Sequence, residues 1–121
     1  MGKQFCYFED YQVGQKGVTT ARTVTEADVV NFACLTADYH RVHVDRHYIT
    51  ADNIYGGRVA HGLLGSSLVT GMLSLNAPHI IGRGVPGAYF CGFNVNYREA
   101  IRLGDTIKTQ WQVAEKASDP A

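Results

Sequence analysis

The stretch of residues 62–75, which holds no charged side chain, limits the fold more than any other feature. Its apolar residues would lie around the full turn of a helix: Leu63, Leu64, Leu68, Val69, Met72, Leu73 and Leu75. A helix that is apolar on every side is a buried helix. Gly65 and Gly71 lower its helix propensity, which indicates that other parts of the chain pack closely against it. We therefore predict a central helix about 21 Å long, covered by a sheet that wraps around it.

Strand patterns occur before and after this helix. Residues 17–24 are rich in β-branched side chains, and residues 89–98 and 107–113 alternate apolar with polar side chains. The sequence Thr-Glu-Ala-Asp at residues 25–28 resembles a capping box and predicts a short helix from about residue 26 to residue 36. The elements together predict an α+β fold. Three strands are few to cover an apolar helix, and residues 118–121 have turn chemistry, so we expect a C-terminally incomplete domain that lacks its last strands.

Charge and cysteine content exclude several classes of protein. The chain has 121 residues, the length of a single domain, residues 1–121. Lys plus Arg and Asp plus Glu both total 11, so nothing in the composition predicts a basic face for nucleic acid or an anionic membrane. Cys6, Cys34 and Cys91 form no CxxC pair, which argues against a zinc ribbon or a disulfide framework. With no signal-peptide core and no run of about 18 apolar residues, we expect a cytoplasmic protein without a membrane or nucleic-acid partner.

The segment between the two predicted helices carries the residues suited to chemistry. Residues 37–61 read as irregular, with one short helix around residues 46–54, and Asp38 precedes His43 by five positions. A carboxylate with a reference pKa of about 3.9 and an imidazole near 6.5 can share the transfer of a proton from water. Gly62, at the start of the central helix, offers an unpaired N–H at the positive end of the helix dipole, which suits a developing oxyanion. The pattern predicts acid–base chemistry beside a carbonyl group.

These residues form part of an ordered series that resembles the MaoC-like dehydratases, which include the (R)-specific enoyl-CoA hydratases. The series comprises Phe8-Glu9-Asp10, Val13-Gly14, Arg22 to Asp28, Phe32, Asp38, His43-Val44-Asp45 and Gly57 to Leu64. The resemblance implies a hot-dog fold, in which an antiparallel sheet wraps a long central helix. It also implies a homodimer or higher homo-oligomer that binds acyl-CoA. The implied reaction is the reversible syn hydration of a trans-2-enoyl thioester to the (R)-3-hydroxyacyl product, with no separate cofactor because CoA arrives as part of the substrate.

Matched by position, Asp38 and His43 are the expected catalytic pair and Gly62 is the expected oxyanion donor. We also predict five residues at the substrate site: His40, Arg58, Ala60, His61 and Thr70. Among these, Thr70 matches a small hydroxyl residue that supports the catalytic loop in this family. His61 is interpreted as a hydrogen-bonding residue at the helix start rather than a proton carrier. Arg58 is interpreted either as a loop residue or as a contact to CoA phosphate or a substrate carboxylate.

Two departures from the family pattern bear on the substrate. The family loop reads Asp-x-Asn-Pro-x-His, whereas His40 and Arg41 stand here at the Asn and Pro positions. Without the proline, the backbone of the loop is less restricted. A substrate with a second carboxylate would suit a pocket near Arg41 or Arg58. The second departure is length, because two further strands follow the last predicted strand in the family.

Other interpretations remain open at this point. Asp38 and His43 could form a purely structural hydrogen-bonded pair. A metal site is not expected, because the acidic and histidine residues of this segment lack a recognised ligand spacing: Asp38, His40, His43, Asp45 and His61. A hot-dog thioesterase would use a similar carboxylate and water but attack the carbonyl carbon. A non-catalytic acyl-CoA-binding subunit of a hetero-oligomeric hydratase is the alternative outside enzymes.

Overall fold

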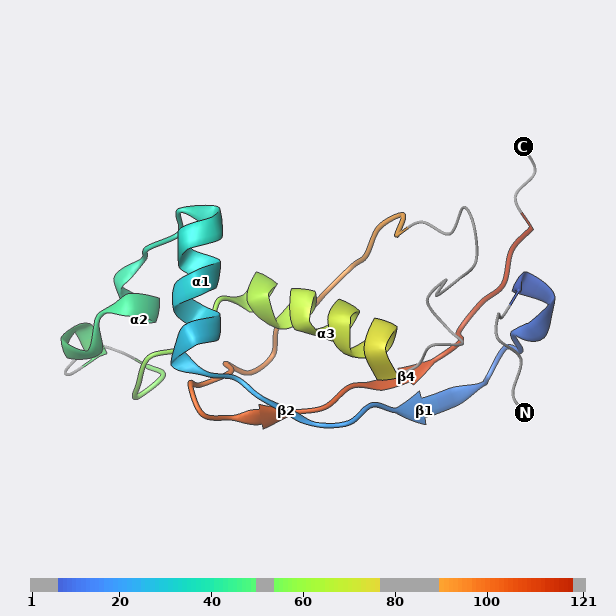
Figure 1. Cartoon of the computed structure of the whole chain (residues 1–121), viewed down its shortest axis with the longest axis horizontal. Helices are drawn as coiled ribbons and strands as arrows, with labels where there is room; N and C mark the ends of the chain where they lie inside the picture. Colours follow the sequence, from blue (N-terminus) through green and yellow to red (C-terminus); the bar gives the residue numbers. More distant parts are fainter. Residues whose placement is uncertain (1–6, 50–53, 77–89, 119–121) are drawn as a thin grey trace. The chain divides into compact units, whose positions relative to one another are not determined.

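The computed structural model describes residues 7–49, 54–76 and 90–118, apart from the side chains of residues 49 and 76. The elements follow one another along the chain as drawn in Figure 1: η1 Phe8–Asp10, β1 Lys16–Val18, β2 Arg22–Thr23, α1 Glu26–Thr36, α2 Arg41–Val44, η2 Arg46–Ile49, α3 Gly62–Asn76, β3 Thr106–Ile107 and β4 Gln110–Gln112. The chain divides into two compact units. Unit 1 holds the described residues up to 20, from 69 to 93 and from 108 onward, and unit 2 holds residues 21–68 and 94–107.

Helix α1, in unit 2, begins and ends as the sequence predicts. The Thr25 hydroxyl accepts a hydrogen bond from the Asp28 N–H at 3.2 Å, and the Asp28 carboxylate accepts one from the Thr25 N–H at 2.9 Å. These two bonds make the capping box, and the bond from the Thr25 N–H to the carboxylate is the main reason that the pKa of Asp28 lies below its usual value. Ala37 ends the helix with a left-handed φ of 62°. The prediction of a helix over residues 26–36 is confirmed.

Unit 2 is held together by a small apolar core between α1, α3 and the strand segments. β2 pairs antiparallel with β3, and Val59 forms a bridge to Arg102. The buried core residues are Val24, Val29, Ala60 and Leu64, with Phe32, Leu68, Ile101, Leu103 and Ile107 packed against them. Because Ala60, just before α3, and Leu64 on α3 lie in the same cluster as Val29 on α1, the start of α3 is fixed relative to α1.

Helix α3 covers Gly62–Asn76, so the predicted central helix is confirmed. Ile101 packs closely against Gly65, as predicted, since a Cβ at Gly65 would lie 2.9 Å from the end of the Ile101 side chain. At Gly71, apart from its own helix turn, no described atom lies within 4 Å of such a Cβ, so close packing there stays a prediction. Burial on every side is wrong for the described residues, because Leu64 is buried whereas Leu75 is 72% exposed. The described strands form two short antiparallel pairs, β1 with β4 and β2 with β3.

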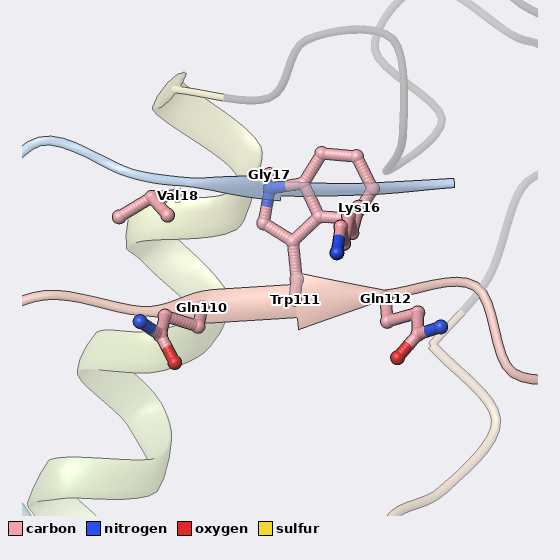
Figure 2. A pocket seen from close by; sticks show the side chains of 6 residues that line it. All are labelled: Lys16, Gly17, Val18, Gln110, Trp111 and Gln112. Atoms are coloured by element: carbon pink, nitrogen blue, oxygen red, sulfur yellow. The ribbon is translucent and has the colours of Figure 1, made fainter. Parts of the chain in front are cut away.

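Unit 1 contains the antiparallel pair of β1 and β4. Gly17 lies opposite Trp111, and a Cβ at Gly17 would be 2.6 Å from the indole ring, so only glycine fits beneath it. Figure 2 shows the Trp111 ring over this pair, in an open hollow whose other lining residues come from the same two strands. Also in this unit, the Thr109 hydroxyl donates to the Met72 sulfur, and Lys116 Nζ donates to the Tyr11 carbonyl.

The strand predictions hold only in part. Residues 17–24 and 107–113 correspond to two short pieces each, β1 with β2 and β3 with β4. The predicted half-buried strand at residues 89–98 is wrong for residues 90–98, which pair with no described strand and are exposed, and residue 89 lies outside the described residues. Alternating side chains favour a strand, but a strand also needs a partner for its backbone groups. None of the helices in the described part of the chain is long and apolar enough to cross a membrane.

Candidate active site

The predicted catalytic pair, Asp38 and His43, lies in unit 2 on a segment that follows α1. We call residues 38–43 the reactive segment. The left-handed Ala37 turns the chain out of α1, and the Asp38 carboxylate then accepts a hydrogen bond from the His40 N–H at 3.3 Å. His40 caps α2, because its Nδ1 accepts from the Val42 N–H at 3.2 Å. His43 therefore lies on the short helix α2. The helix expected around residues 46–54 appears as η2, Arg46–Ile49, and residues 50–53 lie outside the described residues.

The hydrogen bond of His43 determines which ring nitrogen can act as a base. His43 Nδ1 lies 2.7 Å from the Val59 carbonyl oxygen, which can only accept, so Nδ1 carries the hydrogen. The lone pair is left on Nε2. Burial is the largest influence on the His43 pKa and lowers it from 6.5, although the Val59 hydrogen bond acts in the opposite direction. His43 is therefore a neutral imidazole at pH 7, with Nε2 free to take a proton.

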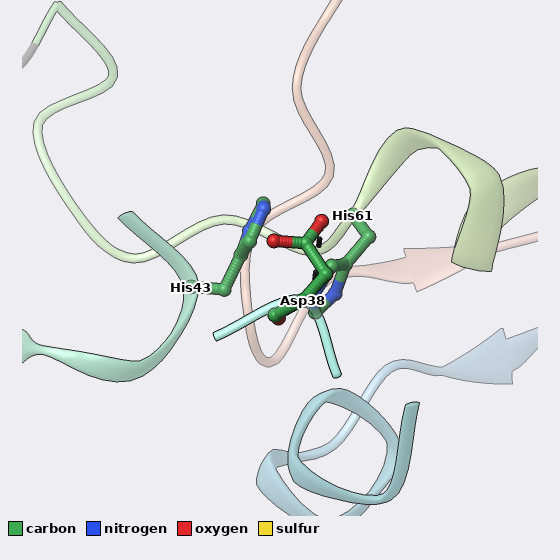
Figure 3. A group of neighbouring side chains, drawn as sticks. All are labelled: Asp38, His43 and His61. Atoms are coloured by element: carbon green, nitrogen blue, oxygen red, sulfur yellow. Dashed lines mark hydrogen bonds and ion pairs between the residues drawn. The ribbon is translucent and has the colours of Figure 1, made fainter. Parts of the chain in front are cut away.

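Asp38, His43 and His61 converge on one point, as Figure 3 shows. One nitrogen or carboxylate oxygen from each residue lies within 4.8 Å of the others. Two hydrogen bonds of about 2.8 Å that meet at one water molecule span about 4.6 Å. The Asp38 side chain is 53% exposed, so water reaches it freely. The arrangement can therefore hold a water between a carboxylate and a neutral imidazole, as acid–base chemistry requires.

His61 supports this group from inside the protein. Its side chain is 4% exposed, and its Nε2 lies 2.9 Å from the Asp38 main-chain carbonyl oxygen and 3.9 Å from the Asp38 carboxylate. The His61 ring stacks on that of His43, with centroids 3.7 Å apart and planes 24° from parallel. The His61 ring also contacts Phe32, with ring centroids 4.9 Å apart. His61 Nδ1 is buried without a hydrogen-bond partner among the described residues.

Arg58 and Ala60, both predicted at the substrate site, make contacts within the protein. Arg58 Nε donates to the His43 carbonyl oxygen at 2.7 Å, and Nη1 forms a 2.6 Å ion pair with Glu26 on α1. Only 15% of the Arg58 side chain is exposed. The Ala60 N–H donates to the Ile101 carbonyl at 2.7 Å. We call residues 58–61 the supporting segment. A contact of Arg58 or Ala60 with substrate stays a prediction.

Gly62 is the first residue of α3, and its N–H meets no acceptor among the described residues. The Tyr97 ring lies so close that a Cβ at Gly62 would be 3.2 Å from it. The Tyr97 hydroxyl is 2.7 Å from the Ser66 hydroxyl, one turn further along α3. Tyr97 was predicted only as a strand residue, and no sequence signal placed it beside the start of α3.

His40 lies beside the reactive histidine, whereas the role predicted for Thr70 stays a prediction. The exposed His40 ring packs edge-on against His43 and Tyr48, with centroids 6.2 Å and 6.0 Å away. His40 is thus brought to the reactive group. Thr70 lies on the part of α3 that belongs to unit 1, and its supporting role stays a prediction. Arg41, proposed near a substrate carboxylate, is paired with Asp45 at 3.0 Å.

Asp38, His43 and His61 are also the residues that could offer ligands to a metal ion. The ring nitrogens of a histidine bind a metal in the plane of the ring. Two rings stacked 3.7 Å apart with planes 24° from parallel do not direct their lone pairs to one point. One ring would have to leave its carbonyl partner and rotate. The observed geometry therefore favours acid–base chemistry over metal binding at this group.

Comparison with known proteins decides the family. The family model described as "MaoC like domain" matches residues 10–119. The chain belongs to the MaoC-like domain family. The 3-hydroxybutyryl-CoA dehydratase of Methylorubrum extorquens is 33% identical over 109 residues, which cover 90% of this chain and 64% of that protein. The (R)-specific enoyl-CoA hydratase of Rhodospirillum rubrum is 31% identical, over 84% of this chain and 65% of that protein.

Solved structures of other proteins share the fold. A monoamine oxidase regulatory protein from Archaeoglobus has a TM-score of 0.80 and 32% identity, covering 93% of this chain and 73% of its own. The R-hydratase PhaJ1 from Pseudomonas aeruginosa has a TM-score of 0.71 and 27% identity, covering 91% of this chain and 66% of its own. The predicted hot-dog fold is confirmed. The chain spans 64%, 29% and 65% of the length of three curated relatives that it matches.

Proposed function

We propose that this chain carries the catalytic residues of a hydratase that adds water reversibly to a trans-2-enoyl-CoA, giving an (R)-3-hydroxyacyl-CoA. The observation that carries the proposal is the convergence of the Asp38 carboxylate with a neutral His43 whose Nε2 lone pair is available. Membership of the MaoC-like family supports it, since relatives in this family are named as a dehydratase and an (R)-specific hydratase acting on CoA thioesters.

In the hydration direction, Asp38 and His43 hold one water beside C3 of the enoyl chain. The water oxygen forms the new bond to C3 while its proton passes to this pair, and the electrons of the C2=C3 bond move toward the thioester carbonyl. The developing enolate oxygen accepts from the Gly62 N–H at the start of α3, which has no other acceptor among the described residues. The proton then returns from the pair to C2. Dehydration follows the same steps in reverse.

The chemistry needs only the acyl-CoA thioester and water, so we propose no separate cofactor. A base, a carboxylate and an N–H donor are all supplied by this chain. Among the residues predicted to bind substrate, His40 is the one proposed to contact it directly, because its ring is exposed beside His43. The hydrogen-bond donors described above for the other residues bind main-chain carbonyl oxygens of the protein itself, which holds for Arg58, Ala60 and His61. We also propose a homodimer or larger homo-oligomer, as the family resemblance implies.

The test is a spectroscopic assay with crotonyl-CoA that follows the loss of the conjugated enoyl thioester. The wild-type protein should consume it without releasing thiol, and Asp38→Asn should lower the rate by about 10²- to 10⁴-fold, the usual contribution of acid–base groups. Circular dichroism of both proteins controls for folding. Near wild-type turnover in Asp38→Asn would overturn the assignment. Release of free CoA would indicate a thioesterase, and tight acyl-CoA binding without turnover would indicate a non-catalytic subunit.

A further inference from the structure

The main-chain carbonyls of both residues of the catalytic pair are held by side chains of one short segment. His61 Nε2 contacts the Asp38 carbonyl at 2.9 Å, and Arg58 Nε contacts the His43 carbonyl at 2.7 Å. The reactive segment contains no proline to fix its backbone, and the Asp38 side chain is 53% exposed. Packing around Asp38 itself therefore gives the carboxylate little restraint. Its position depends on contacts made from elsewhere in unit 2.

The two stacked histidines are in opposite tautomers. A carbonyl oxygen only accepts, so the contact with Asp38 places the hydrogen of His61 on Nε2, whereas the contact with Val59 places that of His43 on Nδ1. The remaining lone pair of His61 is on Nδ1, which is buried and meets no donor among the described residues. His61 thus has no nitrogen with both a lone pair and a path to substrate. It is unsuited to be the acid or the base of the reaction.

We infer that His61 is a positioning residue that sets the geometry of the catalytic pair. Its Nε2–H holds the Asp38 main chain, so that the carboxylate lies near the His43 ring, and its ring face supports that ring. Phe32 on α1 also contacts the His61 ring, so His61 packs against both α1 and the reactive histidine. This inference rests on the proposed hydratase function. It departs from the prediction that His61 binds substrate.

Three substitutions separate the hydrogen bond from the ring. His61→Gln keeps an amide N–H near the Nε2 position. His61→Asn has an amide that ends near the Nδ1 position and does not reach the Asp38 carbonyl. His61→Phe keeps the ring and the stack on His43 but has no donor. We expect kcat for crotonyl-CoA to fall by about 10- to 100-fold in His61→Phe and His61→Asn, with KM changed far less, because a small displacement of a catalytic group lowers the rate rather than the affinity.

His61→Gln should restore kcat to within about fivefold of wild type, as expected when an equivalent donor is retained. A purely structural role would instead lower the midpoint of denaturant unfolding while leaving kcat per folded molecule unchanged in all three variants. Equal kcat in His61→Phe, His61→Asn and wild type would therefore overturn the inference. So would an equal loss in His61→Gln and His61→Asn.

A second measurement does not depend on activity. Nitrogen-15 NMR of the histidine rings in the full chain near neutral pH should show His61 with hydrogen on Nε2 only and His43 with hydrogen on Nδ1 only. Hydrogen on Nδ1 of His61 would contradict the inferred contact with Asp38. If the wild-type protein leaves crotonyl-CoA unchanged while the spectra show the expected tautomers, the proposed function fails and the hold on Asp38 stands. If the protein is active with the other tautomer, only the inference about His61 fails.

Discussion

The reactive segment, residues 38–43, and the supporting segment, residues 58–61, differ in nearly every physical respect. The first bears the exposed Asp38 and a half-buried His43, whereas the second bears Val59, Ala60 and His61, all buried. The side chains of the reactive segment carry its chemistry. The supporting segment binds it through main-chain carbonyl oxygens: His61 and Arg58 contact those of Asp38 and His43, and the Val59 oxygen accepts from His43. Reactivity and rigidity are therefore supplied by separate segments of the chain. The reactive residues can stay open to water because other residues hold their backbone.

The largest expected effect lies in the reactive segment. His43→Asn places an amide N–H near the position of Nδ1, so the contact with the Val59 carbonyl can persist while the Nε2 base is lost. We expect a fall in kcat for crotonyl-CoA hydration of about 10²- to 10⁴-fold. The denaturant midpoint should stay close to wild type, which controls for folding. Activity within tenfold of wild type would mean that His43 is not the base.

A smaller effect is expected from Arg58 in the supporting segment. Arg58→Met removes the Nε contact with the His43 carbonyl together with the ion pair to Glu26, because a thioether has no N–H to donate. Glu26→Gln is the matched control, because it removes the ion pair and leaves the Nε contact. We expect kcat to fall by about tenfold in Arg58→Met and to change by less than about twofold in Glu26→Gln. Equal losses in both variants would assign the effect to the ion pair rather than to the carbonyl contact.

The core beneath both segments should affect stability without affecting the chemistry. Val24 is fully buried and packs in the cluster that contains Ala60 and Leu64. Val24→Ala should lower the free energy of unfolding by about 2 kcal/mol, through lost apolar burial and the cavity it leaves. Urea unfolding measures that loss, and kcat per folded molecule should remain at the wild-type value. A tenfold loss of kcat in the folded variant would show that core packing and the site are not separable.

The capping box of α1 is expected to matter least. Thr25→Ala removes the hydroxyl that accepts from the Asp28 N–H, at a cost of about 1 kcal/mol. Urea unfolding is again the measurement, and Thr25→Ser should retain most of the stability because it keeps the hydroxyl. A Thr25→Ser variant as unstable as Thr25→Ala would show that the hydroxyl is not the cause.

The sequence predicted those features that depend on local pattern. The capping residues gave the start of α1, and the uncharged stretch gave α3. The spacing of Asp38 and His43, with the family resemblance, predicted the two side chains that converge. The contacts of Arg58 with His43 and of His61 with Asp38 join residues 15 and 23 positions apart, and no local pattern encodes them.

The predictions that were wrong or missing also depend on contacts between residues far apart in the chain. Alternation over residues 89–98 predicts which faces a strand would have, but not whether a partner strand pairs with it. The apolar surface of α3 indicates that burial is favourable, but not which residues provide it. The approach of Tyr97 to Gly62 was missed for the same reason, since it depends on where residues 94–107 return to the start of α3.

The pH dependence of kcat/KM for crotonyl-CoA hydration tests the central claim most directly, that a neutral His43 takes the proton from water. Burial lowers the His43 pKa from 6.5, so the neutral form of His43 still predominates when the pH has fallen to 6.5. kcat/KM should therefore remain above half of its plateau value at pH 6.5 and fall further at lower pH as His43 becomes protonated. An acidic limb with its midpoint above 6.5, or a profile with no acidic limb down to about pH 4, would contradict the account.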